Sequence, residues 1–139
     1  FMGYQRAETD GDLTRYVIEG GNAADTIDLE HVESAAPTAD LGAGSVHHIA
    51  FAVDDRAAQL RVREALMETG YQVTPVIDRD YFWAIYFRTP GGVLFEIATN
   101  EPGFDRDEDT ANLGQALKLP ARYEPHRDKI EALLPPIEA

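Results

Sequence analysis

Residues 46–53 (VHHIAFAV) place a histidine inside an alternating apolar pattern, and this pattern constrains the fold more than any other segment. Successive side chains of a β-strand point to opposite faces. Read as a strand, the segment has one face made of Ile49, Phe51 and Val53, which we expect to lie in the core. The opposite face carries His48 beside two alanines. This face leaves open space next to the imidazole.

A second apolar strand is predicted at residues 93–98 (VLFEIA), after the turn signal of residues 90–92 (PGG). Its single acid, Glu96, lies on the face opposite the large apolar side chains. A carboxylate is costly to bury unless it is paired or binds a metal ion. The first pair to test as metal ligands is therefore His48 and Glu96.

The segments around this pair predict the element order β-α-β-β-β. After two aspartates, the spacing of apolar residues favours a helix that runs to about Thr69 and ends at Gly70. Three strands should follow, at residues 71–77, 82–88 and 93–99. We expect the helix to bury Ala58, Val62, Ala65 and Leu66 and to expose Gln59, Arg61, Arg63, Glu64 and Glu68.

The first thirty residues repeat the last part of this unit. They predict three strands separated by glycine-containing turns, at residues 4–8, 13–19 and 26–31. Their spacing matches the last three strands of a β-α-β-β-β unit, so we interpret them as a repeat whose first strand and helix are missing. On this interpretation the chain begins in the middle of a module.

The expected fold is therefore α+β, with paired βαβββ modules of which the first is incomplete and with a strongly curved mixed sheet. Residues beyond 100 should form a loop and two short helices, which we expect to pack across a barrel rather than to carry chemistry. The predicted organisation is one structural domain in four parts: a partial module (1–33), a linker (34–45), a complete module (46–100) and a C-terminal loop with short helices at 111–117 and 127–134 (101–139).

Composition excludes several classes of function. The chain has no cysteine, so neither disulfides nor thiolate metal sites are possible. Its 25 acidic and 12 basic residues give a net charge of −13, which would repel nucleic acids and anionic membranes. No apolar run approaches the roughly 20 residues of a membrane span, and no signal peptide pattern is visible at the N-terminus, so a cytoplasmic protein is expected. Lys118 and Lys129 are the only lysines, which favours a salt-adapted, halophilic source over an ordinary acidic protein.

Taken together, several segments resemble a known superfamily, the vicinal oxygen chelate (glyoxalase, bleomycin resistance and dioxygenase) proteins. Within it, they are similar to the C-terminal half of ring-cleaving extradiol dioxygenases of the hydroquinone type. The segments that carry the resemblance are residues 46–51 (VHHIAF), 76–79 (VIDR), 85–88 (IYFR), 91–98 (GGVLFEIA) and 113–120 (LGQALKLP).

The resemblance implies a metal centre. In this family iron(II), sometimes manganese(II), is held by two histidines and one carboxylate, which leaves coordination positions open. His48 and Glu96 match the histidine and the glutamate of the C-terminal half. The second histidine is expected from the N-terminal half, which this chain would lack. His31 and His126 match no family motif, and Asp28, at the position of Glu96 in the repeat, is an improbable second site.

Three more residues correspond to family residues near the substrate. His47 would be a histidine beside the ligand with an acid–base role, although strand alternation alone points it away from His48. Tyr86 lies on the open face of its strand, where a phenol can donate to a substrate oxygen; packing is the alternative. Arg79 would favour a deprotonated substrate phenol, and the alternative is a salt bridge with a neighbouring aspartate, Asp78 or Asp80.

The implied activity is ring cleavage of a small dihydroxylated aromatic, a hydroquinone or catechol, with insertion of both atoms of O2. Two alternatives stay open: a glyoxalase-like metal-dependent isomerase or lyase of the same superfamily, and a non-catalytic half-site or binding module. We expect the intact protein to be an enzyme and this chain alone to be inactive. Open strand edges predict a homodimer.

Overall fold

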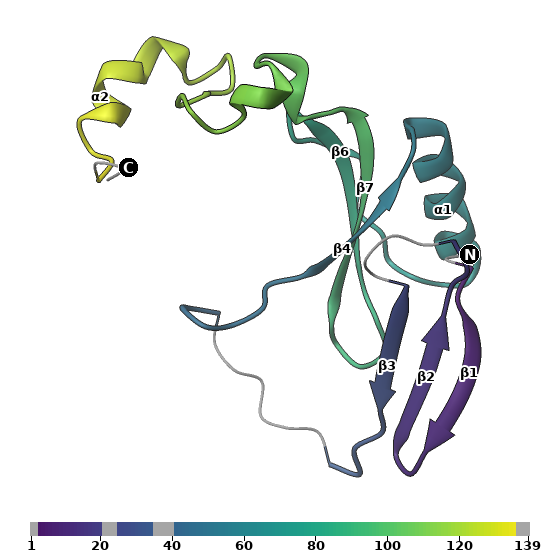
Figure 1. The fold of residues 1–139 in the computed structure, drawn as a ribbon. Helices are drawn as coiled ribbons and strands as arrows, with labels where there is room; N and C mark the ends of the chain where they lie inside the picture. Colours follow the sequence, from purple (N-terminus) through teal and green to yellow (C-terminus); the bar gives the residue numbers. More distant parts are fainter. Residues whose placement is uncertain (1–2, 21–24, 35–40, 136–139) are drawn as a thin grey trace.

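The computed structural model describes residues 3–20, 25–34 and 41–135. A three-stranded antiparallel sheet comes first, in the order β1-β2-β3. A four-stranded mixed sheet follows, in the order β4-β7-β6-β5, in which β4 and β7 are parallel and the other neighbours antiparallel (Figure 1). The strands are β1 (Gln5–Asp10), β2 (Leu13–Val17), β3 (Thr26–Glu30), β4 (Ile49–Val53), β5 (Ile77–Asp78), β6 (Phe82–Arg88) and β7 (Leu94–Pro102).

The predicted α+β class and the β-α-β-β-β order of residues 46–100 are confirmed. Two strands differ from expectation. β4 begins at Ile49, so the two histidines precede it, and β5 covers two residues instead of 71–77. Upstream of β5, Val73 makes only an isolated bridge to Phe87. Within the described residues the sheets do not close into a barrel. Most of the predicted linker, residues 35–40, lies outside the described residues.

Helix α1 (Arg56–Glu68) covers one face of the second sheet. It begins at Asp55, whose carboxylate accepts a hydrogen bond from the backbone N–H of Ala58 at 2.7 Å. The chain leaves the helix at Gly70, whose φ of 88° suits glycine. Its most buried apolar side chain is Leu66. This leucine forms the core with three residues of β6 and β7: Ile85, Phe87 and Ile97.

Gln59 corrects the expected helix pattern. We expected it to face water, but its side chain is fully buried against the sheet. Its amide Nε2 donates to the carbonyl oxygens of Trp83 at 2.7 Å and Ile97 at 2.8 Å. The β6–β7 register shifts between Phe82 and Ala84, so the Trp83 carbonyl lies at an irregularity of the ladder. The glutamine therefore ties the helix to two strands.

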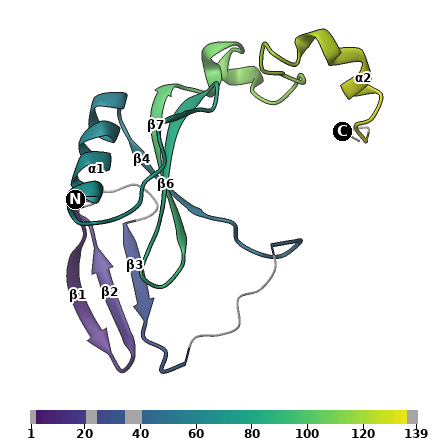
Figure 2. The same cartoon turned by 180° about the vertical axis from the view of Figure 1, so that it is seen from behind.

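The tail also differs from expectation. Residues 111–117 do not form the expected α-helix. The segment begins in a short 3-10 helix, η2 (Thr110–Asn112), and continues in turns. The other short elements are η1 (Phe104–Arg106), η3 (Glu124–His126) and α2 (Arg127–Glu131), which is shorter than the predicted 127–134. Figures 1 and 2 both show α2 projecting away from the two sheets, so it does not pack across them.

The first sheet lies beside the β6–β7 hairpin in both views (Figures 1 and 2). Its centre is a ladder of charges, because Arg15 on β2 is in register with Glu8 on β1 and Asp28 on β3. The guanidinium of Arg15 donates to both oxygens of Asp28, at 2.8 and 2.7 Å, and to Glu8 at 3.2 Å. No helix among the described residues has the length and hydropathy needed to cross a membrane.

We predict that Gln59→Leu lowers the free energy of unfolding by about 1–3 kcal/mol, because two buried carbonyl groups lose their donor. Urea denaturation followed by the fluorescence of Trp83, the single tryptophan, measures the change. The matched control is Gln72→Leu, an exposed position where the change should stay within about 0.5 kcal/mol. Equal losses in the two variants would contradict the bridging role of Gln59.

A second prediction concerns Asp28. The hydrogen bonds from Arg15 lower the pKa of this carboxyl. A lowered folded-state pKa contributes stability that is present above the unfolded pKa and is lost as the pH falls through the folded pKa. Arg15→Gln should therefore raise the pKa of Asp28, measured by carbon-13 NMR of the carboxyl group. Arg6→Gln, whose guanidinium bonds Thr9 on the same hairpin, should leave it unchanged.

Candidate metal centre

The sheet face opposite α1 brings His48 and Glu96 together. Glu96 lies on β7, the central strand between β4 and β6, and its side chain is 3% exposed. The small side chain of Ala50 is in register with it on β4, which leaves room above the carboxylate. His48, just before β4, places its Nε2 2.7 Å from Glu96 Oε2. The buried carboxylate thus has a polar partner, as burial requires.

His47 contacts His48 directly. Their Nδ1 atoms are 2.8 Å apart, and the two rings are perpendicular with centroids 5.1 Å apart. Two ring nitrogens at this distance need one proton between them, so one Nδ1 donates and the other accepts. The expectation that strand alternation separates the two rings is wrong, because β4 begins only at Ile49 and imposes no alternation on the residues before it.

Tyr86 lies on the other side of Glu96. It is in register with Glu96 across the β6–β7 pair, and its ring meets the His48 ring edge-on with centroids 6.0 Å apart. The pKa of the Tyr86 phenol is raised, mainly by burial. Nearby Arg79 lowers this pKa, and Glu96 raises it further. Tyr86 is therefore a protonated phenol at neutral pH and can donate a hydrogen bond.

Arg79 reaches this phenol from the turn between β5 and β6. Its Nη2 donates to the Tyr86 hydroxyl at 3.2 Å, and its guanidinium carbon is 5.5 Å from the centre of the tyrosine ring. Asp78 accepts a hydrogen bond from the backbone N–H of Asp80 instead of pairing with Arg79. The structure thus brings all five residues singled out from the sequence to one region, in the order Arg79, Tyr86, Glu96, His48 and His47.

A divalent metal ion fits the His48–Glu96 pair. An imidazole nitrogen and a carboxylate oxygen are donors that iron and manganese accept. Two ligand atoms that bind one ion at about 2.1 Å each and at a right angle lie about 3 Å apart, close to the observed separation. The ion would replace the proton that the two atoms share here.

The other candidates considered from the sequence do not complete this pair. No group of three possible ligands occurs within the described ranges 3–20, 25–34 and 41–135. Asp28 is engaged by Arg15, as described above. His31 follows β3 and His126 ends η3, both exposed to solvent. The described part of the chain therefore offers two protein ligands.

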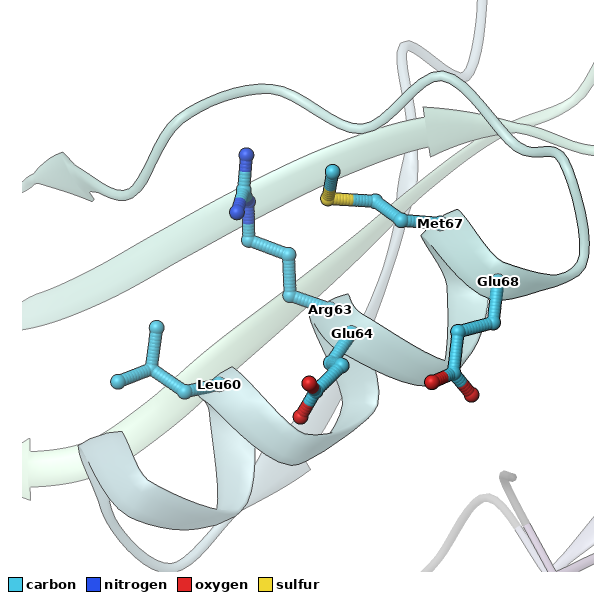
Figure 3. Close-up of a pocket in the computed structure, with 5 residues that line it drawn as sticks. All are labelled: Leu60, Arg63, Glu64, Met67 and Glu68. Atoms are coloured by element: carbon cyan, nitrogen blue, oxygen red, sulfur yellow. The ribbon is translucent and has the colours of Figure 1, made fainter.

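Hollows lie elsewhere on the surface of the described residues, two of them beside α1 and beside β3. One, of about 580 Å³, follows the outer side of α1 (Figure 3). Here Arg63, expected to face water, is half-buried and donates to the carbonyl oxygen of Thr74 at 3.0 Å. The other, of about 790 Å³, lies between β3 and the β6–β7 hairpin and includes Leu29 and Phe95. Neither hollow is lined by His47, His48, Arg79, Tyr86 or Glu96, and sequence reasoning identified neither.

Sequence reasoning considered Asp80 only as a salt-bridge partner of Arg79 and missed its ion pair with Arg122 and its backbone conformation. Its φ of 68° is in the left-handed region, which is uncommon outside glycine and is tolerated best by aspartate and asparagine. The only signal in the sequence is the pair of aspartates that brackets Arg79, which is typical of a turn.

Two curated proteins similar to this chain are named as dioxygenases. MhqO of Bacillus subtilis (strain 168), named as a ring-cleaving dioxygenase, is 46% identical over 137 residues, which cover 99% of this chain and 43% of MhqO. The chlorohydroquinone/hydroquinone 1,2-dioxygenase of Sphingobium indicum is 40% identical over 125 residues, which cover 87% of this chain and 38% of that enzyme. The chain thus spans less than half of the length of these relatives.

A solved structure supports the fold. The crystal structure of a Bacillus subtilis protein described as a dioxygenase superimposes with a TM-score of 0.86 at 46% identity, covering 98% of this chain and 43% of that protein. The family model of the Glyoxalase/Bleomycin resistance protein/Dioxygenase superfamily matches residues 4–97. The chain therefore belongs to the glyoxalase/bleomycin resistance/dioxygenase superfamily.

Proposed function

We propose that this chain supplies His48 and Glu96 as two of the three protein ligands of an iron(II) centre, with manganese(II) as the alternative metal. The centre would serve a ring-cleaving dioxygenase of the extradiol type, which inserts both atoms of O2 into a hydroquinone or catechol. The observation that carries the proposal is the buried Glu96 carboxylate, 2.7 Å from His48 Nε2, with the Tyr86 phenol on its other side. The names of the relatives support the same chemistry.

When bound, the metal would supply open coordination positions for a substrate oxygen and for dioxygen, together with its capacity for redox change. The histidines would hold a proton in a defined place. A neutral His48 that binds a metal through Nε2 must carry its proton on Nδ1, and this N–H would donate to Nδ1 of His47. His47 would thereby select the tautomer and orientation of the ligand.

Tyr86 and Arg79 would handle the substrate. The Tyr86 hydroxyl accepts a hydrogen bond from Arg79 and lies within hydrogen-bonding reach of Glu96. When a metal ion engages Glu96, the phenol could turn its proton to a substrate oxygen. Arg79 carries a permanent positive charge that favours the deprotonated form of a substrate phenol. The small side chain of Ala50, in the same row, leaves space over the carboxylate. These residues orient the substrate and stabilise negative charge on its oxygen.

The third ligand would come either from further protein sequence or from a second copy of this chain in a homodimer. Because the described residues supply two ligands only, a non-catalytic half-site is a second candidate function for the chain by itself. A glyoxalase-like isomerase is the other alternative within the superfamily; it could use a metal without redox chemistry, such as zinc, and would consume no oxygen.

We predict that the chain, loaded anaerobically with iron(II), retains the metal through His48 and Glu96. Either His48→Ala or Glu96→Ala should reduce retained iron, measured by elemental analysis after desalting, by at least about tenfold, because each removes half of the ligands present. His126→Ala, an exposed histidine of the tail, is the matched control and should retain the wild-type amount.

Oxygen uptake with hydroquinone and catechol then separates the candidate functions. Uptake that depends on both ligands supports the dioxygenase. Iron retained without uptake contradicts the dioxygenase activity of this chain and leaves the isomerase and the half-site, which an isomerase assay separates. Iron that His48→Ala or Glu96→Ala does not affect contradicts the proposed centre. If the wild-type chain retains no iron, it acts as a half-site, and the catalytic proposal passes to a longer protein that contains it.

A further inference from the structure

The turn between β5 and β6 carries Arg79 and has an unusual backbone. The N–H of Arg79 donates to the carbonyl oxygen of Phe82 at 2.9 Å, which closes the turn. Asp80 has a φ of 68°, and its N–H donates to the carboxylate of Asp78 at 2.8 Å. An L-residue keeps this conformation when the surrounding contacts determine it. The contacts that hold Asp80 therefore decide where Arg79 points.

Two arginines of the C-terminal segment contact Asp80. The guanidinium of Arg106 in η1 donates to its carbonyl oxygen. Arg122, farther along the chain, places its Nη1 3.6 Å from the Asp80 carboxylate. Both contacts fall on the residue directly after Arg79. The segment starts beside this turn because Phe82, the first residue of β6, pairs with Pro102 at the end of β7.

Aromatic packing adds to these polar contacts. The ring of Phe104 stacks on that of Tyr81 with centroids 5.3 Å apart, and it lies 6.1 Å from the ring of Phe82. The Tyr81 hydroxyl donates to the carboxylate of Asp107 at 3.0 Å, and the N–H of Gly103 donates to the Tyr81 carbonyl at 3.0 Å. An exposed ion pair alone contributes little. The turn is held by this set of contacts together.

We propose that residues 103–122 are a positioning element of the candidate site: they hold the turn at Asp80 and thereby keep Arg79 against the hydroxyl of Tyr86. The inference rests on the proposed function, in which these two side chains face the substrate. It gives the first part of the tail a role that the sequence did not indicate. The last part of the tail that the structure describes makes no such contact with the turn: Arg127 pairs with Glu124 and Glu131 and donates to the carbonyl oxygen of Leu117 at 3.2 Å.

The test measures the Arg79–Tyr86 contact in the metal-free chain, by nuclear Overhauser effects between the two side chains in arginine- and tyrosine-labelled protein. The signals are assigned with Arg79→Lys and Tyr86→Phe. In the double variant Arg106→Gln/Arg122→Gln, and separately in Phe104→Ala, we expect the cross-peaks to be lost or to fall severalfold. Arg106→Lys/Arg122→Lys, which keeps both charges, should retain more of the contact than the glutamine pair.

Glu131→Gln is the matched control, since it removes a tail ion pair with Arg127, and among the described residues Glu131 bonds neither the turn nor residues 103–122. This variant should keep the wild-type cross-peaks. Methyl signals of Leu66 and Ile85 show that each variant has kept its core. If the folded glutamine pair and the folded Phe104→Ala variant both keep the contact, the proposal is overturned. No metal or substrate is present, so this outcome is independent of whether the iron centre and the dioxygenase activity exist.

Discussion

The site depends on a carboxylate buried in the middle of a sheet. Glu96 is 3% exposed, and an ionised carboxylate without partners would cost on the order of several kcal/mol at such a position. His48 lowers this cost by placing Nε2 2.7 Å from it. The same requirement limits the neighbouring positions. A large apolar side chain at position 50, in register on β4, would occupy the space above the carboxylate, and alanine leaves it open.

β7 pairs with β4 on one side and with β6 on the other, so Glu96 has a neighbour in register on each strand. Ala50, Glu96 and Tyr86 lie side by side across three strands, on the face that α1 does not cover. On the other face, Leu66 of the helix packs on Ile97, the next residue of β7. The buried amide of Gln59 bonds carbonyl groups of both β6 and β7. Helix packing thus holds the strands from one side while their opposite side chains stay available for chemistry.

Strand alternation explains how much the sequence could predict. The two-residue period is local, so it placed Phe95 and Ile97 in the core. His48 lies beside Glu96, but it precedes β4, so alternation within that strand does not account for its position. The period failed at His47, because the strand begins two residues later and alternation does not extend beyond it. It failed at Gln59, because the partners of a buried glutamine are carbonyl groups at a ladder irregularity, which has no signal in a helix pattern. The helix expected at 111–117 is absent, and this segment forms a short 3-10 helix and turns instead.

Asp28 and Glu96 show why position in a repeat does not determine function. Asp28 lies on β3 and Glu96 on β7, each the last strand of its module, and each carboxylate contacts a basic side chain. Asp28 lies in a sheet whose residues are largely exposed, where Arg15 is in register and binds both of its oxygens. Both oxygens of this carboxylate are bonded to a permanently charged guanidinium, so they are not free to bind a metal ion. The partner of Glu96 is an imidazole, which can release a proton to solvent near neutral pH and offer its nitrogen lone pair to a metal ion. The choice between arginine and histidine therefore separates a structural ladder from a candidate metal centre.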